Sequence, residues 1–265
     1  MNVTTPRVAR LDTTAPHSAR VWDYWLLGKD NFAADRTAGD LVSARYPQII
    51  AIVHASRAFQ ARAVRHLVAE RGVGQFLDIG PGLPRPEATH AVAQQYKPAA
   101  RVVYIDNDPV VLVHCRALAD SHPDGRVECL DADMRTDRPR LIAEAATTLD
   151  MGQPIAVLLL DVLSAIPDYR QARTVVRDLM AAVPAGSFLV INDGVTVDPA
   201  AVAASAVARG AGLPYHLRHP DEFRGYLDGL DLVDPGVVTT PGWRPDDGAV
   251  AAELASWCAV ARKPA

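Results

Sequence analysis

The pattern of hydrophobic and polar positions divides the chain near residue 72. Before this point, apolar residues recur at helical spacing in three stretches, 18–27, 31–45 and 47–72. After it, short apolar runs alternate with helical segments that often begin at proline. The sequence therefore predicts a disordered tail over 1–16, an N-terminal helical extension over 17–72 and a core over 73–265.

The core pattern predicts a sheet of mostly parallel strands. Continuous apolar strands separated by helices are typical of a parallel sheet covered on both faces. Two further strands near the C-terminus have no crossover helix between them, so we expect them to pair antiparallel. The expected fold class is α/β, with a doubly wound, Rossmann-like sheet. The expected strands are 75–79, 101–106, 126–130, 155–161, 187–192, 232–239 and 256–262.

Composition excludes several classes of protein. Of the 265 residues, 49% are hydrophobic and 22% are charged, which is ordinary for a folded globular chain. The net charge of -4 gives no electrostatic footprint for nucleic acid or for an anionic membrane. The sequence has no apolar stretch of bilayer-spanning length, and its N-terminus lacks the apolar segment of a signal peptide. We therefore expect a cytoplasmic protein with neither a nucleic-acid nor a membrane partner.

The three cysteines lie far apart in the sequence and among apolar residues. This setting predicts that Cys115, Cys129 and Cys258 are small buried side chains in a reducing compartment. The histidines show no spacing typical of metal ligands, so no metal site is expected.

Glycines and acids follow the first four predicted strands. Gly80 and Gly82 follow the first, Asp106 the second, Asp133 the third and Asp161 the fourth. The carboxyl ends of parallel strands meet at one edge, where open α/β sheets bind their ligands. Glycines let the backbone approach a ligand, an acid after the second strand accepts ribose hydroxyls, and Asp133 can accept from the amine of adenine. Each residue alone has a simple structural explanation, but together they predict a nucleotide-like ligand.

Two nucleotide-like ligands carry a ribose that such an acid could bind, namely a nicotinamide dinucleotide and S-adenosylmethionine. The pyrophosphate of a dinucleotide needs backbone N–H groups, which Pro81, Pro84 and Pro86 lack. Arg85 also stands where the dinucleotide fingerprint has its third glycine. The sequence favours S-adenosylmethionine. The alternatives are a non-catalytic protein that binds this donor in a regulatory role, and an NAD-dependent oxidoreductase.

Several segments resemble the successive motifs of class I S-adenosylmethionine-dependent methyltransferases, namely FLDIGPGLP, RVVYIDNDPVVL, CLDAD and LLLDVLSAIPD. With HSARVWDYWLLGKDNFAADR, THAVAQ, DGLDLVDPGVV and WRPD, they resemble one bacterial S-adenosyl methyltransferase family, formerly a domain of unknown function. The resemblance runs from about residue 17 to the C-terminus. It implies a seven-stranded sheet with an antiparallel last strand, a helical cap over the site, and methyl transfer from S-adenosylmethionine. The resemblance does not supply the acceptor, for which we expect a small molecule, with a protein as the alternative.

The resemblance also implies donor binding at Gly80, Gly82, Asp106, Asn107 and Asp133. Further residues beside the motifs are expected to join them, namely Asp78, Leu83, Met134, Asp161 and Val162.

The polar loop after Gly28 is expected to close over the ligand. Tyr24, Lys29, Asn31 and Phe32 would then line the pocket, with Lys29 as the partner of the donor's carboxylate. The alternative is that 28–31 form a turn between two helices whose aromatic residues pack inward.

A hydroxyl or ammonium acceptor needs a base. The candidates for this role are Asp161, His54 and Tyr24.

Two residues depart from the family pattern that the resemblance implies. Pro81 stands where relatives usually carry threonine, and Ala88 stands where they often carry asparagine. Both changes remove a hydrogen-bonding group near the expected donor site.

Overall fold

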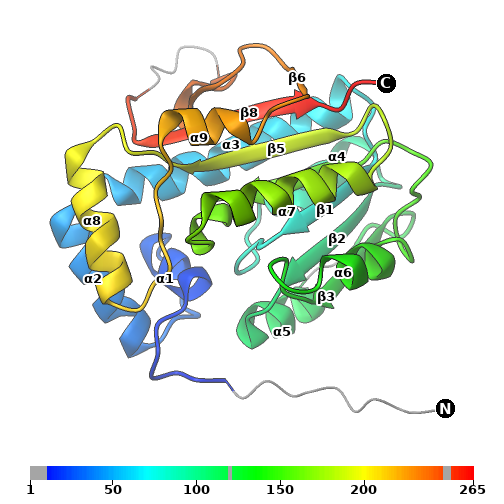
Figure 1. Cartoon of the computed structure of the whole chain (residues 1–265). Helices are drawn as coiled ribbons and strands as arrows, with labels where there is room; N and C mark the ends of the chain where they lie inside the picture. Colours follow the sequence, from blue (N-terminus) through cyan, green and yellow to red (C-terminus); the bar gives the residue numbers. More distant parts are fainter. Residues whose placement is uncertain (1–10, 119–120, 247–251) are drawn as a thin grey trace.

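A mixed sheet lies at the centre of the computed structural model, which describes residues 11–118, 121–246 and 252–265 (Figure 1). The strand order is β3-β2-β1-β4-β5-β8-β6, and β7 also pairs with β8. Strands β1 to β5 are parallel, whereas β8 runs antiparallel to β5, β6 and β7. The strands are β1 (Gln75–Ile79), β2 (Arg101–Asp106), β3 (Arg126–Asp131), β4 (Ala156–Leu160), β5 (Phe188–Gly194), β6 (Asp231–Leu232), β7 (Val238–Thr239) and β8 (Ser256–Arg262).

The expected fold class and the antiparallel last strand are confirmed. One predicted strand, 232–239, is divided into β6 and β7, so the sheet has eight strands where seven were expected. A turn separates the two pieces, in which the Gly236 N–H donates to the carbonyl of Val233 and Gly236 has a φ of +84°. Pro235 beside it has no N–H for a strand ladder, which explains the interruption.

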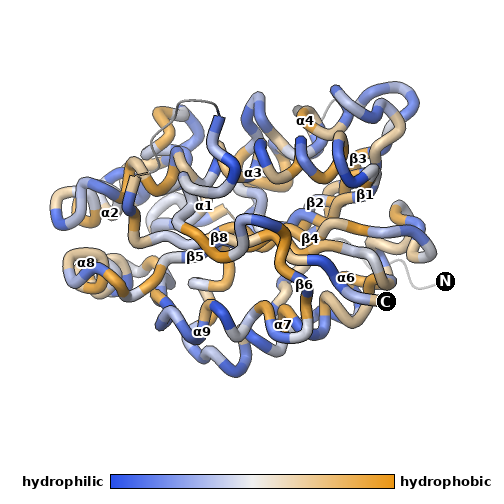
Figure 2. The backbone as a smooth tube through the Cα atoms, turned by 90° about the horizontal axis from the view of Figure 1, so that it is seen from above, coloured by the Kyte–Doolittle hydropathy of each residue, from blue (hydrophilic) through white to orange (hydrophobic). Residues whose placement is uncertain are grey.

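Helices cover both faces of the sheet. In Figure 2, α3 (Ile49–Ala69) and α4 (Thr89–Tyr96) lie on one face, and α6 (Arg138–Ala145), α7 (Tyr169–Ala182) and α9 (Pro220–Gly225) lie on the other. The first face buries Phe59, Phe76 and Trp243, and it includes Cys115 of α5 (Pro109–Leu118). The second face buries Leu159 and Phe223. Burial on both faces explains why β1 is enclosed along its whole length.

The N-terminal helices form a cap at one end of the sheet. Figure 1 shows α1 (Ser18–Trp25) and α2 (Ala33–Arg45) grouped there with α8 (Pro199–Gly210). These helices share a hydrophobic cluster that includes Val21, Trp25 and Ala204. Of the tail expected over 1–16, residues 1–10 lie outside the described residues, while the carbonyls of Asp12 and Ala15 accept hydrogen bonds from Arg20. Movement of the cap as a lid stays a prediction.

Two of the three cysteines are paired. Cys115 on α5 and Cys129 on β3 form a disulfide, with their Cα atoms 6.3 Å apart, so the expectation that they are free is wrong. Helix α5 follows β2 and packs back over β3, and this packing brings together two apolar positions that the sequence shows only as separately buried. Cys258 on β8 is free and buried. Within the described part of the chain, no helix combines the length and apolarity that crossing a membrane requires.

Candidate active site

A cavity of about 370 Å³ opens at the carboxyl ends of β1, β2, β3 and β4. The chain turns from β3 to the opposite side of β1 when it forms β4, so the cavity lies where the strand order reverses. Helices α1 and α3 and residues 212–215 complete its walls. The structure brings together here most of the residues expected from the strand ends, namely Asp78, Gly80, Gly82, Asp106, Asn107, Asp133, Met134, Asp161 and Val162.

The loop after β1 needs both of its glycines. Gly80 has a φ of +69°, and a Cβ there would lie 2.7 Å from Cγ2 of Val162. Gly82 has a φ of +68°, and a Cβ there would lie 3.0 Å from Nη2 of Arg57. Both the left-handed backbone and the close neighbours disfavour any side chain. The loop therefore offers a bare backbone surface to a ligand.

Asp78 at the end of β1 is held by a chain of hydrogen bonds. Thr89 Oγ1 donates to Asp78 Oδ2 at 2.7 Å, and Gln60 Nε2 donates to Thr89 Oγ1 at 2.9 Å. Burial raises the pKa of Asp78 to about 6, against the opposing effects of the Thr89 hydrogen bond and the Arg57 charge. The carboxylate thus joins the strand to α3 and α4.

Asp106 at the end of β2 accepts hydrogen bonds through one of its two carboxylate oxygens. Its Oδ1 accepts from the N–H groups of Asn107 at 2.8 Å and Asp108 at 2.9 Å, while no described residue donates to Oδ2. Burial raises the pKa of Asp106 to about 6. The carboxylate lines the cavity with one oxygen available, as binding of ribose hydroxyls requires.

Asp133 already has a partner. Arg135 Nε donates to its Oδ1 at 2.9 Å, and Arg135 Nη2 donates to its Oδ2 at 2.6 Å. The hydrogen bonds from Arg135 lower the pKa of Asp133. An adenine amine at this position would therefore share Asp133 with Arg135, a cavity residue that the sequence analysis did not identify.

Asp161 follows β4 in an uncommon backbone conformation, with a φ of +53°. Its Oδ2 accepts from Ser56 Oγ at 2.7 Å and from Asn192 Nδ2, whereas its Oδ1 is buried and has no hydrogen-bond partner among the described residues. Burial raises the pKa of Asp161 to about 6. Non-glycine residues at positive φ concentrate at functional sites, so the backbone geometry indicates that Asp161 is a candidate functional residue.

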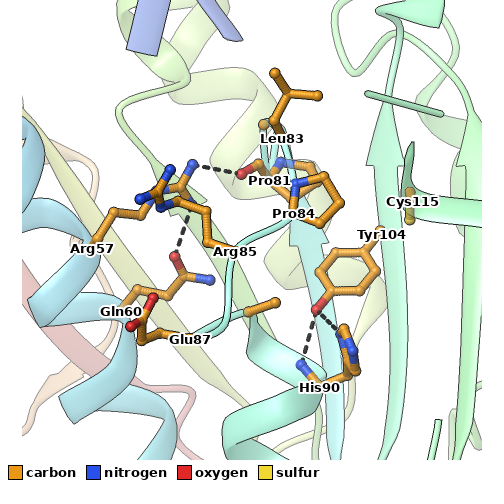
Figure 3. Close-up of a pocket in the computed structure, with 12 residues that line it drawn as sticks. Arg57, Gln60, Pro81, Leu83, Pro84, Arg85, Glu87, His90, Tyr104 and Cys115 are labelled. Atoms are coloured by element: carbon orange, nitrogen blue, oxygen red, sulfur yellow. Dashed lines mark hydrogen bonds between the residues drawn. The ribbon is translucent and has the colours of Figure 1, made fainter. Parts of the chain in front are cut away.

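Arg57 on α3 also lines the cavity, although the sequence analysis did not identify it. Its Nη2 donates to the carbonyl of Pro81 at 2.9 Å and its Nη1 donates to Gln60 Oε1 at 3.0 Å (Figure 3). The guanidinium carbon lies 5.9 Å from the ring centroid of Trp22, and Nε is buried with no hydrogen-bond partner in the part of the chain that the structure describes. One arginine within a helical pattern of an arginine-rich chain gives no sequence signal. Only the packing of α3 against the glycine loop identifies it.

A smaller cavity of about 20 Å³ lies behind the glycine loop (Figure 3). Its size suits a water molecule and not a nucleotide. Tyr104 closes one side, where its hydroxyl accepts from the N–H of His90 at 2.9 Å. Leu83 lines this cavity and packs against Val110 and Val111. Leu83 thus lies at the smaller cavity, and its expected part in donor binding stays a prediction.

The turn between α1 and α2 lies outside the larger cavity. Tyr24 donates to Asp40 Oδ1 at 2.7 Å, Asn31 donates to Asp23 Oδ2 at 3.0 Å, Phe32 packs near Leu83, and Lys29 is exposed. The expectation that Tyr24, Lys29, Asn31 and Phe32 line the pocket is therefore wrong, and the helix–helix turn is the better interpretation.

Gly28 explains this turn. Its N–H donates to the carbonyl of Asp23 at 2.8 Å, and any Cβ would overlap the Asp23 carboxyl group. The chain therefore bends tightly towards α2. His54 is exposed on α3 and does not line the cavity either, which leaves Asp161 among the expected base candidates.

The cap covers the cavity with the other end of α1. His17 and Trp22 line the cavity, and His17 Nδ1 lies 2.8 Å from Oδ2 of Asp108, just after β2. Arg20 Nε lies 3.5 Å from the same oxygen. These contacts join α1 to the edge of the sheet beside Asp106. The expected cap over the site is present, although different residues of it face the ligand space.

A sheet of this order with an antiparallel last strand, and acids and glycines at the strand ends, defines a class I methyltransferase. The chain belongs to the S-adenosyl methyltransferase family, whose profile matches residues 4–264. It is thus an S-adenosylmethionine-dependent methyltransferase, and S-adenosylmethionine is its methyl donor.

Solved structures agree with this assignment. A DUF574 family protein from Streptomyces avermitilis is 37% identical, with a TM-score of 0.91 over 96% of this chain and 100% of its own. A protein from Thermobifida fusca, described as a candidate methyltransferase, is 34% identical, with a TM-score of 0.88 over 100% of both chains. An O-methyltransferase family 2 protein from Planctomyces limnophilus shares the fold at 19% identity, with a TM-score of 0.51 over 92% of this chain and 65% of its own. A search of curated proteins found no match.

Proposed function

We propose that this enzyme transfers the methyl group of S-adenosylmethionine to a hydroxyl or amino group of a small molecule. The observation that carries the proposal is the cavity at the switch point, in which Asp106 faces the ligand space beside a glycine loop that needs no side chain. The family supplies the donor and the reaction, whereas the acceptor is inferred from the cavity walls.

The residues of the cavity fit the donor. Asp106 would bind the ribose through its available oxygen, and Asn107, Asp133 and Met134 would surround the adenine. The backbone of Gly80 and Gly82 would support the methionyl part. When bound, the donor supplies an electrophilic methyl group on a sulfonium. The protein's main task is to hold the acceptor atom in line with it at ~3 Å.

The remaining walls indicate the character of the acceptor. Trp22 of α1, with Pro214 and Tyr215 from the segment after α8, forms an aromatic and apolar enclosure beside Asp161. Tyr215 lies over the end of β5, where a Cβ on Gly194 would be 2.5 Å from its hydroxyl. The cap and this segment together limit the space to a small molecule with an apolar body. Such an enclosed space favours a small-molecule acceptor over a protein side chain.

Calorimetric titration with S-adenosylmethionine tests the donor site. Binding is expected for the wild type, and Asp106→Asn should weaken it about tenfold or more through the loss of charged hydrogen bonds. Asp131→Asn is the matched control, because Asp131 pairs in register with Asp106 at the end of β3 but is exposed. No heat from a folded sample, or equal affinity in Asp106→Asn, would contradict the proposal.

Labelled donor tests the transfer itself. Incubation with a fractionated small-molecule extract from bacterial cells should label at least one compound. Donor binding without any labelled product would favour the non-catalytic, regulatory alternative. Titration with NADH should give no binding, and saturable binding would instead support the oxidoreductase alternative.

A cytoplasmic location stays a prediction. The Cys115–Cys129 disulfide argues against it, because disulfides are typical of oxidising compartments. Thiol labelling of the protein in freshly lysed cells, under conditions that block exchange, decides between the two.

A further inference from the structure

A disulfide bond joins the two chain segments that flank the expected adenosine site. It links Cys115 on α5 to Cys129 on β3. Helix α5 begins three residues after Asp106, and β3 ends two residues before Asp133. Both acids line the cavity where the adenosine part of the donor is expected. The bond therefore holds together two walls of that part of the site.

The start of α5 positions the acid that is expected to bind the ribose. Asp106 Oδ1 accepts from the N–H groups of the two residues after it, which lead directly into the helix. Val111 in the first turn of α5 packs against Leu83 of the glycine loop. Val111 also lies four residues before Cys115, so both side chains share one face of the helix. A shift of α5 on the sheet would therefore move the hydrogen-bond donors of Asp106 and a neighbour of the glycine loop together.

The bond lies at the edge of the sheet. Strand β3 is at one end of the strand order, and Cys129 is the one residue of this strand that is buried. Such edge elements open locally more easily than the central strands of a core. Cys115 is 4% exposed and Cys129 is 7% exposed, so a thiol reaches the sulfur atoms through local opening of this edge.

Loss of the bond changes the packing of α5 on β3. Bonded sulfur atoms are about 2 Å apart, and two separate thiols cannot remain that close. Protein interiors are close-packed and transmit such a displacement to their neighbours. Cys129 pairs in register with Tyr104, and Tyr104 and Cys115 both line the small cavity behind the glycine loop (Figure 3). Reduction therefore disturbs the support of the adenosine site from behind.

We propose that the Cys115–Cys129 disulfide is a redox switch of donor binding, in which the oxidised enzyme binds adenosine tightly and the reduced enzyme binds it weakly. This inference rests on the proposed function and adds regulation to its site. A dithiol protein supplies the reduction. One of its thiolates attacks a sulfur of the disulfide, the S–S bond breaks and a mixed disulfide forms. Its second thiolate then releases the enzyme, which gains two electrons and two protons while the dithiol becomes a disulfide.

Calorimetry on the full chain, before and after treatment with dithiothreitol, tests the switch. Reduction should weaken the binding of S-adenosylhomocysteine about 5- to 20-fold. It should weaken 5′-methylthioadenosine by the same factor, because the two ligands share the adenosine part. Oxidised glutathione should restore both affinities. Mass spectrometry of the alkylated protein counts the free thiols and so identifies the form in each titration.

Linkage and a matched pair of variants give independent measurements. A ligand that prefers the oxidised form by a given factor must shift the equilibrium between the disulfide and dithiothreitol by the same factor. Cys129→Ser should bind both ligands as weakly as the reduced wild type and should not respond to dithiothreitol. Cys258→Ser, which replaces the free cysteine, should respond like the wild type. The titration of the wild type by dithiothreitol does not depend on whether either variant folds.

The failures of the switch and of the proposed function give different results. Equal affinity of the oxidised and the reduced wild type for S-adenosylhomocysteine would overturn the switch and leave the proposed function intact. A disulfide that dithiothreitol reduces only when the protein unfolds, as circular dichroism would show, would also overturn it, because such a bond is a permanent structural link. Wild-type protein that binds neither ligand in either form would contradict the proposed function and the switch together.

Discussion

The hydroxyl of Thr89 donates to Oδ2 of Asp78 across 2.7 Å and joins the first turn of α4 to the end of β1. The same hydroxyl accepts from Gln60 on α3, so one buried side chain connects three elements around the glycine loop. Thr89 has no exposed surface. Its position therefore affects both the stability of the fold and the shape of the donor site.

Replacing Thr89 by valine keeps the volume and removes the hydroxyl. Asp78 and Gln60 would each lose a buried partner, so we expect the free energy of unfolding to fall by roughly 2–4 kcal/mol. Denaturant unfolding measures this loss. Thr37→Val on the exposed face of α2 is the control and should change stability by less than about 0.5 kcal/mol. Equal stability of Thr89→Val and the wild type would show that the network contributes nothing.

Ala88 occupies the N-cap position of α4, with an extended backbone and no side-chain cap. Ala88→Asn should supply the side-chain acceptor that this N-cap lacks and raise the free energy of unfolding by about 1 kcal/mol. Ala58→Asn, on an exposed position inside α3, should instead lower it by a few tenths of a kcal/mol. Thermal unfolding of both variants checks the sign. A lower melting temperature in Ala88→Asn would mean that the small cavity beside Ala88 cannot hold the new side chain.

The contact of His17 with Asp108 is expected to keep α1 over the cavity. Asp108→Asn retains the acceptor for the Val110 N–H but removes the charge that faces His17 and Arg20. Residues 17–25 should then exchange their amide hydrogens several-fold faster, and S-adenosylhomocysteine should bind more weakly. Exchange followed by mass spectrometry measures the first effect. Asp30→Asn, which affects a more exposed contact with His114, is the control, and the same exchange in both variants would argue against the contact.

The raised pKa of Asp161 predicts that its contribution to stability falls as the pH rises. Burial raises this pKa from 3.8 to about 6, so folding favours the protonated form. Its contribution to stability is complete below about pH 4 and is lost as the pH rises through about 6. In the ligand-free protein, the free energy of unfolding of Asp161→Asn should therefore rise by roughly 1–2 kcal/mol relative to that of the wild type as the pH is raised from 5 to 7.5.

Denaturant unfolding of both proteins at the two pH values measures this difference. The groups that act on or feel the Asp161 charge are Arg57, Asp193, Tyr215 and Cys258, and they are present in both proteins. Asp131→Asn, on an exposed position, is the control. A difference between wild type and Asp161→Asn that does not change with pH would refute the predicted shift.

The sequence predicted the strand-end residues well because two rules connect them to the cavity. Apolar runs mark parallel strands, and the carboxyl ends of such strands lie together at one edge. Gly80, Asp106 and Asp161 follow such runs, and the structure places all three in one cavity. The roles of these residues in binding stay predictions. Arg57 and Arg135 could not be found in this way, because Arg57 is one arginine within the helical pattern of an arginine-rich chain and Arg135 follows the strand end without any motif.

The cap shows what helical spacing along the sequence does not determine. Its helices were expected in the right places, but the turn at 28–31 was expected to face the ligand. Helical spacing shows which residues share a face and does not show which neighbour that face meets. The fold turns this loop towards α2 and presents His17 and Trp22 to the cavity instead. The pairing of Cys115 with Cys129 was missed for the same reason.

The sequence by itself determined the order of helices and strands, the parallel sheet and the row of acids and glycines along its edge, because these depend on periodicity and on local backbone preference. The tertiary structure alone decided which distant side chains meet there. Arg57 and Ser56 reach Pro81 and Asp161 only because α3 packs across the sheet. Such contacts depend on the packing of whole elements against each other, and no local pattern in the chain records that packing.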